Sequence, residues 1–125
     1  MISQRELFYS YIAQTSPEPM DLQIEKAEGV YLIDNKGRKY IDLISGISVS
    51  NVGHCNPNVV KAIKDQAEKY MHLMVHGEYI QSPQIELAKA ICDLLPKELD
   101  NVYFVNSGSE AIEGALKLAK RTTGR

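Results

Sequence analysis

The sequence lacks the features that mark several classes of protein. Its formal net charge is only −2 at pH 7, so no electrostatic excess favours nucleic acid or an anionic membrane as a partner. No apolar run approaches the roughly 18 residues that indicate a membrane-spanning helix, and no P-loop pattern occurs. The two cysteines, Cys55 and Cys92, have no metal-ligand spacing, which indicates reduced thiols of a cytosolic protein or small core residues.

The N-terminus adds one further absence. Residues 1–6 are polar and contain no apolar stretch of the kind found in a signal peptide, so a cytoplasmic location is expected. What is present is ordinary: 125 residues, of which 44% are hydrophobic and 24% are charged. A chain of this size and composition is one globular domain or a piece of a larger domain.

Local patterns predict a helix and a hairpin near the start of the chain. Ser3 and Glu6 match the S-x-x-E capping box, which predicts an amphipathic helix from about residue 3 to residue 14. Two segments with a period of two, residues 30–33 and 39–43, flank an Asp-Asn-Lys-Gly sequence that favours a tight turn. These two segments are therefore predicted to form a β-hairpin.

Residues 45–54 follow the hairpin and are rich in small side chains. Ile47 and Val49 alternate with serines, and this period of two predicts a strand. A strand of small residues lets a ligand or another backbone approach closely, but an ordinary strand with a serine face has the same pattern.

Two helices are predicted in the middle of the chain. One is expected to begin with Asn56 as N-cap and Pro57 at the first helical position, and the other with Ser82 as N-cap and Pro83. Between them, His76 and Glu78 stand two residues apart but have no third ligand nearby, so no metal site is expected. The sequence does not assign a role to these two residues or to Tyr79.

Residues 102–111 read as a strand, a turn of small residues and the first turn of a helix. The apolar run 102–105 predicts a buried strand, and the helix is expected to start at about Ser109. Ser107, Gly108 and Ser109 offer backbone N–H groups at the positive end of the helix dipole, where a phosphate binds well. The alternative is that Ser109 is only an N-cap and Gly108 only a turn residue.

The last helix carries apolar residues over most of its surface, so it is expected to be buried against a sheet. A parallel strand should follow such a strand and helix. No such strand follows in the sequence, so we expect the N-terminal part of a longer protein. The alternative is a chain that pairs its open edges with other copies.

Three stretches carry a family resemblance: residues 30–42 running into 46–49, Gly53-His54 with Pro57 and its helix, and residues 106–111 with Glu113 and 115–119. Together they resemble the start of a class III pyridoxal-phosphate-dependent aminotransferase, the group that includes acetylornithine, ornithine and 4-aminobutyrate aminotransferases. The similarity extends from about Ile24 to Arg125. One departure is Asn56, where relatives often have His, and Asn caps a helix equally well.

The resemblance implies roles for individual residues. Gly108 and Ser109 would hold the phosphate of pyridoxal 5′-phosphate through backbone N–H groups, with Ser107 beside them. Residues 46–49 would lie near the substrate side of the site, and His54 would be structural. The loop at residues 72–81 would lie near the active site or the dimer interface.

The resemblance also implies that the catalytic residues lie elsewhere. In the family, a lysine far downstream forms a Schiff base with the cofactor and an aspartate pairs with the pyridine nitrogen. Neither is expected within residues 1–125, so no catalytic residue is predicted here, and the 125-residue chain alone is expected to be inactive.

The expected fold is α/β, the N-terminal part of a fold type I pyridoxal-phosphate-dependent transferase. A β-hairpin segment would be followed by helices and the first strand-helix unit of the large domain. Residues 1–23 would form a helical arm, residues 24–55 a small β-meander segment, and residues 56–125 the incomplete start of the large cofactor-binding domain.

The expected function of the intact protein is transfer of an amino group from an amino acid or omega-amine donor to a 2-oxo acid, by a homodimer without nucleic-acid or membrane partners. The alternative is a non-catalytic module that binds a phosphorylated ligand or assembles with other chains.

Overall fold

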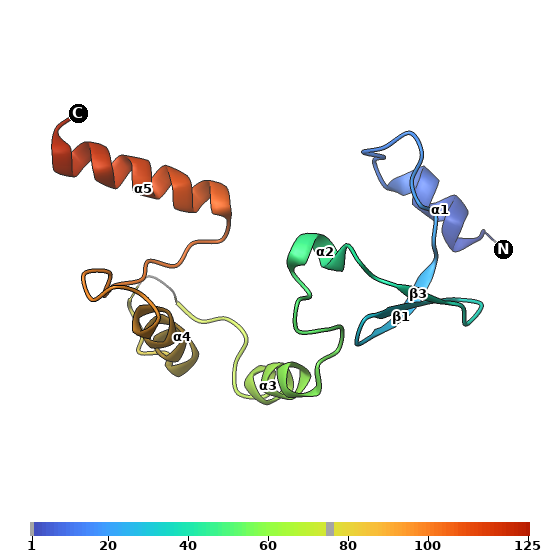
Figure 1. The fold of residues 1–125 in the computed structure, drawn as a ribbon, viewed down its shortest axis with the longest axis horizontal. Coiled ribbons are helices and arrows are strands. Elements are labelled where there is room, and N and C mark those ends of the chain that lie inside the picture. Colours follow the sequence, from blue (N-terminus) through green and yellow to red (C-terminus); the bar gives the residue numbers. More distant parts are fainter. Residues whose placement is uncertain (1, 75–76) are drawn as a thin grey trace. The chain divides into compact units, whose positions relative to one another are not determined.

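The structure, a computed structural model, describes residues 2–74 and 77–125 and divides into two units, Met1–His72 and Leu73–Arg125. Figure 1 shows the helices and strands along the chain. The division at residue 72 concerns contacts within the chain, and the predicted boundaries after residues 23 and 55 stay predictions. Among the described residues, no helix is both long and apolar enough to cross a bilayer.

Helix α1, Gln4–Tyr11, begins the first unit. Ser3 accepts a hydrogen bond from the Glu6 N–H at 3.2 Å, and the Glu6 carboxylate accepts one from the Ser3 N–H at 2.7 Å. This reciprocal pair confirms the capping box that the sequence predicted, although the helix is shorter than residues 3–14.

A three-stranded antiparallel sheet follows, with strands β1 (Ile24–Glu28), β2 (Tyr31–Asp34) and β3 (Lys39–Ile41) in the order β1-β2-β3. Strands β2 and β3 form the predicted hairpin, so that prediction is confirmed. Asp34 closes it, because its carboxylate accepts hydrogen bonds from the N–H groups of Lys36 and Arg38, each at 2.9 Å. Among the described residues Asp34 is the one buried polar residue, only 3% exposed.

The predicted strand at residues 45–54 is wrong. Residues Ser45–Ser48 form a short helical turn, α2, in which all four residues have positive φ, from 49° at Ser45 to 64° at Ser48. This left-handed conformation costs roughly 1–2 kcal/mol for each residue with a Cβ, so something must hold the turn in place. The alternation of Ile47 and Val49 with serines has the period of a strand, but it does not show which contacts hold the residues in a left-handed turn.

Helix α3, Pro57–Ala67, ends the first unit and starts as predicted. The Asn56 side chain accepts hydrogen bonds from the N–H groups of Asn58 at 3.0 Å and Val59 at 3.4 Å, and Pro57 occupies the first turn. An asparagine N-cap followed by proline satisfies the free amides of a helix start without needing any distant contact.

The second unit contains helices α4, Ser82–Asp93, and α5, Gly108–Thr123. Ser82 was predicted to be the N-cap of α4, which is wrong by one residue: the Gln81 carbonyl accepts the Ile85 N–H at 3.1 Å and starts the helix earlier. Helix α5 ends at Gly124, whose φ of 69° is the left-handed conformation that glycine adopts at little cost.

Two further predictions in this unit are wrong. Residues 102–105 form no strand, since among the described residues strand pairing is confined to β1, β2 and β3, and Tyr103 is 75% exposed. Every residue of α5 is exposed, although burial against a sheet was expected. No hydrophobic side chain of the described residues is buried, so these elements have local hydrogen bonds but no apolar core of their own.

Candidate functional site

The start of α5 is built by a second reciprocal cap. Ser107 is the N-cap, and its hydroxyl accepts the Glu110 N–H at 3.2 Å. In return, the Glu110 carboxylate accepts the N–H groups of Asn106 at 2.7 Å and Ser107 at 3.1 Å. The alternative that Ser109 is only an N-cap is therefore wrong, because Ser107 and Glu110 have the three-residue spacing that a capping box needs.

This cap leaves the next two amides open. Gly108 and Ser109 occupy the first two helical positions, and within the described residues no acceptor bonds to their N–H groups. A Cβ built on Gly108 would meet no atom within 4 Å, so a ligand can approach the backbone there. The helix dipole adds a partial positive charge at the same end.

A shallow hollow of about 460 Å³ lies on this turn, lined by Gly108, Ser109, Ile112, Glu113 and Leu116. The two acidic side chains nearby are both engaged: Glu110 in the cap, and Glu113 with Lys117, whose Nζ lies 2.8 Å from its Oε1. Two open N–H groups beside an unobstructed glycine at the positive end of a helix fit a phosphate group.

The three residues predicted to bind a phosphate therefore differ in the structure. Gly108 and Ser109 present free amides, whereas both the N–H and the hydroxyl of Ser107 are taken up by Glu110. Sequence reasoning placed the three residues together and missed Glu110, which organises the turn. The S-x-x-E spacing from Ser107 to Glu110 was the signal that could have revealed it.

A second cluster surrounds the left-handed turn α2 in the first unit. Asp42 Oδ1 accepts the N–H groups of Ile44 at 3.0 Å and Ser45 at 2.8 Å, and Asp42 Oδ2 lies 2.7 Å from His54 Nε2. The hydrogen bond from the Ser45 N–H, followed by the one from His54, holds the pKa of the Asp42 carboxyl below its ordinary value. Sequence reasoning did not select Asp42.

His54 is itself fixed by the backbone. It exchanges two hydrogen bonds with Gly29, its N–H to the Gly29 carbonyl at 2.8 Å and the Gly29 N–H to its carbonyl at 3.0 Å. Gly53 has a φ of 87°, and a Cβ there would lie 3.4 Å from the Gly29 oxygen. This close approach places the His54 ring against Asp42, consistent with the structural role that the resemblance implied.

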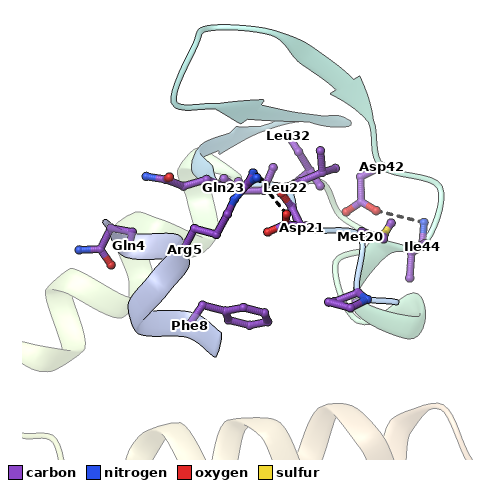
Figure 2. A pocket seen from close by; sticks show the side chains of 13 residues that line it. Gln4, Arg5, Phe8, Met20, Asp21, Leu22, Gln23, Leu32, Asp42 and Ile44 are labelled. Carbon is purple, nitrogen blue, oxygen red and sulfur yellow. Dashed lines mark hydrogen bonds and ion pairs between the residues drawn. The ribbon is translucent and has the colours of Figure 1, made fainter. Parts of the chain in front are cut away.

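A cavity of about 610 Å³ borders this cluster, and Figure 2 shows the side chains around it. Helix α1 contributes Phe8 and Arg5, whose Nη1 lies 3.1 Å from Asp21 Oδ2. Asp42, Ile44 and Gly46 form another part of the lining, so the left-handed turn is a wall of this cavity.

The predicted residues of the loop at 72–81 add no cluster. His76 lies outside the described residues, and Glu78 and Tyr79 are exposed. Within residues 2–74 and 77–125, no group of three or more His, Cys, Asp or Glu side chains is arranged to hold a metal ion.

The chain is similar to known aminotransferases over most of its length. The family model described as Aminotransferase class-III matches residues 11–125. The acetylornithine aminotransferase of Archaeoglobus fulgidus is 43% identical over 102 residues, which are 82% of this chain and 26% of that protein. The acetylornithine aminotransferase of Methanocaldococcus jannaschii is 47% identical over 96 residues, 77% of this chain and 23% of that protein. The chain thus spans about a quarter of the length of these relatives.

Solved structures are similar over the same stretch. The adenosylmethionine-8-amino-7-oxononanoate aminotransferase of M. jannaschii has a TM-score of 0.82 and 36% identity over 92% of this chain and 27% of its own. The taurine:2-oxoglutarate aminotransferase of Bifidobacterium kashiwanohense, solved in complex with PLP and glutamate, has a TM-score of 0.80 and 36% identity, covering 95% of this chain and 27% of its own.

Proposed function

Because this chain belongs to the class III aminotransferase family, we propose that the intact protein is a transaminase that uses pyridoxal 5′-phosphate. It moves an amino group from an amino acid or omega-amine donor to a 2-oxo acid acceptor. Pyridoxal phosphate supplies an electron sink for the charge that develops on the donor during proton removal. The residues of this chain supply part of the site that binds it.

The open amides of Gly108 and Ser109 are the observation that carries this proposal. Their N–H groups would donate to the phosphate oxygens, and the dipole at the start of α5 would favour the negative charge. Hydrogen bonds from uncharged donors to a charged acceptor are stronger than those between neutral groups, so two amides make a substantial anchor.

Ser107 and Glu110 act on the phosphate indirectly. Their reciprocal bonds fix the direction of the first helical turn and so aim the two open amides. The Glu110 carboxylate is occupied by two backbone donors, at Asn106 and Ser107, which offsets part of its charge where an anion is to bind. A capped but open helix start is suited to hold a phosphate in one orientation.

Similarity to acetylornithine aminotransferases at 40–47% identity supports acetylornithine as the first donor to test. The taurine:2-oxoglutarate enzyme supports 2-oxoglutarate as the first acceptor. The intact protein is expected to be a homodimer located in the cytoplasm.

The 125-residue chain alone is expected to give no turnover. The family's lysine and aspartate are expected downstream, and the described residues bury no hydrophobic side chain that would keep the site rigid. If the intact protein binds a phosphorylated ligand without turnover, the non-catalytic module becomes the better account.

The test uses the full-length protein with pyridoxal phosphate. It is assayed with 2-oxoglutarate against acetylornithine, ornithine, 4-aminobutyrate and taurine, and the cofactor is then trapped with borohydride and located by peptide mapping. Turnover with one of these donors and a label on a lysine outside residues 1–125 are expected. No turnover with any donor and no labelled lysine would overturn the proposal.

A further inference from the structure

The turn α2 is unusual because left-handed residues follow one another. Gly46, which adopts this conformation at little cost, is only one of the four, and Ile47 is β-branched with φ 60° and ψ 58°. Its side chain is 88% exposed, so packing around Ile47 does not hold the conformation. Backbone hydrogen bonds close the turn: the Ile44 carbonyl accepts the N–H groups of residues 47 and 48, and the Ser45 carbonyl accepts those of residues 49 and 50. Two further hydrogen bonds fix the N–H groups at the start of the turn.

Those bonds converge on Asp42. Its Oδ1 binds the Ile44 and Ser45 N–H groups, which fixes the entry into the turn, and its Oδ2 faces His54 Nε2. The Asp42 and His54 side chains are only 9% and 20% exposed. His54 is held in turn by its two backbone bonds to Gly29 at the end of β1.

We propose that Asp42 and His54 form a positioning pair that sets the substrate side of the transaminase site by holding α2 in its left-handed conformation. This inference rests on the proposed function, since it concerns the fit of the amino donor. His54 does not line the cavity, whereas Asp42, Ile44 and Gly46 do. His54 therefore acts through Asp42 on the position of the wall.

The two carboxylate oxygens of Asp42 bind different partners. Figure 2 shows the hydrogen bond that Asp42 accepts from Ile44 at the edge of the cavity. When His54 fixes Oδ2, the carboxylate cannot rotate and Oδ1 stays aimed at the two amides. Without His54, the carboxylate gains rotamers and the turn can relax to ordinary φ values, which moves Gly46 in the cavity wall. On this proposal the amino donor binds against this wall, whereas the open amides proposed for phosphate belong to the other unit, on α5.

The test compares two substitutions of His54 in the full-length protein. His54→Leu removes the N–H that faces Asp42, whereas the amide nitrogen of His54→Gln reaches about the same position and can still donate. We expect His54→Leu to raise the KM for the amino donor about tenfold, with kcat changed by less than about threefold. The KM of His54→Gln is expected to lie close to that of the wild type.

Asp34→Ala is the matched control. Asp34 also accepts two backbone N–H groups and pairs with a cation, Arg38, but it does not line the cavity. Its substitution is expected to lower thermal stability without raising the donor KM. Cofactor absorbance should be the same in all four proteins.

Amide hydrogen exchange at Ile44 and Ser45 provides a readout that does not depend on turnover. In His54→Leu, exchange at these two amides is expected to accelerate at least about tenfold relative to wild type, and in His54→Gln it is expected to stay near wild type. If the wild-type protein shows no transaminase activity, the proposed function fails. The exchange experiment still tests whether Asp42 and His54 hold the turn α2.

An unchanged KM and unchanged exchange in a folded His54→Leu protein would overturn the inference. An equal rise in KM in the Asp34→Ala control would also overturn it, because the rise in KM would then result from a general loss of stability.

Discussion

Ser107 and Glu110 each accept a hydrogen bond from the other's backbone: the Glu110 N–H to the Ser107 hydroxyl at 3.2 Å, and the Ser107 N–H to the Glu110 carboxylate at 3.1 Å. This pair takes up Ser107 and leaves Gly108 and Ser109 to donate outward. The helix start thus separates residues that build the turn from residues that can hold an anion.

Gly108→Pro tests the anion role of a single N–H. Proline is compatible with the first helical position, and Ser107 already has the extended conformation that precedes proline, with φ −146° and ψ 160°. The helix should therefore form without the Gly108 donor. We expect the dissociation constant for pyridoxal phosphate in the full-length protein to rise about tenfold or more, measured by absorbance titration.

Gly108→Ala is the control for this change, because it keeps the N–H and its Cβ meets no atom within 4 Å. Affinity for pyridoxal phosphate should stay near that of the wild type. Equal affinities for the Pro and Ala variants would contradict the assignment of the Gly108 amide.

Ser107→Ala tests the cap separately from the anion site. Loss of an N-cap side chain should reduce the free energy of unfolding of the full-length protein by about 1 kcal/mol, as followed by chemical denaturation. Ser107→Asp keeps a capping oxygen, so most of the stability should return, but its negative charge should weaken phosphate binding. A Ser107→Asp protein with unaltered cofactor affinity would argue against a phosphate at this turn.

Asp34 gives the hairpin a dependence on pH. Burial raises the pKa of its carboxyl, but hydrogen bonds from Arg38, Lys36 and Tyr40 outweigh burial and lower the pKa from 3.8 to about 2. Because the folded pKa lies below the unfolded one, the stabilisation is present above about pH 4 and is lost as the pH falls towards 2.

Asp34→Asn should remove this contribution. Between pH 5 and 2, the free energy of unfolding of the wild type is expected to fall more steeply than that of Asp34→Asn, as measured by urea titration at each pH. Parallel curves for the two proteins would show that Asp34 does not have this role.

Gly53→Ala tests the close approach that places His54. At a φ of 87°, alanine is strained, and its Cβ would lie 3.4 Å from the Gly29 oxygen. Gly37→Ala, with a φ of 77° and no atom within 4 Å, carries the conformational cost without a neighbour. Because 3.4 Å is an ordinary van der Waals separation, we expect a loss of about 1 kcal/mol for each variant by denaturant unfolding. A much larger loss for Gly53→Ala would contradict this expectation and mean that the Gly29 backbone cannot shift.

The sequence predicted those features that a few neighbouring residues determine. The cap at Ser3 and Glu6, the N-cap at Asn56 and the hairpin around residues 34–37 depend on local hydrogen bonds and turn residues, and all three are present. The class III assignment was also right, since it rested on several motifs in the expected order and spacing.

The failures involve partners that no local pattern reveals. The left-handed turn is bonded at its start to Asp42, which pairs with His54 twelve residues later. An aspartate two residues before the first bonded amide is a turn signal, and Asp42 could have been found that way. Residues 102–105 have the composition of a strand, but a strand also needs a neighbour, and composition does not supply one.

The exposure of the apolar side chains has a consequence for calorimetry. The heat-capacity change of unfolding arises mainly from apolar surface newly exposed to water, and the described residues already expose much of theirs, since no hydrophobic side chain among them is fully buried. Their caps and hairpin can melt with little change in heat capacity. This stretch would have a large heat-capacity change of unfolding only when its apolar faces are buried against other protein. The curvature of its free energy of unfolding with temperature would therefore measure that burial, even where helix content is unaltered.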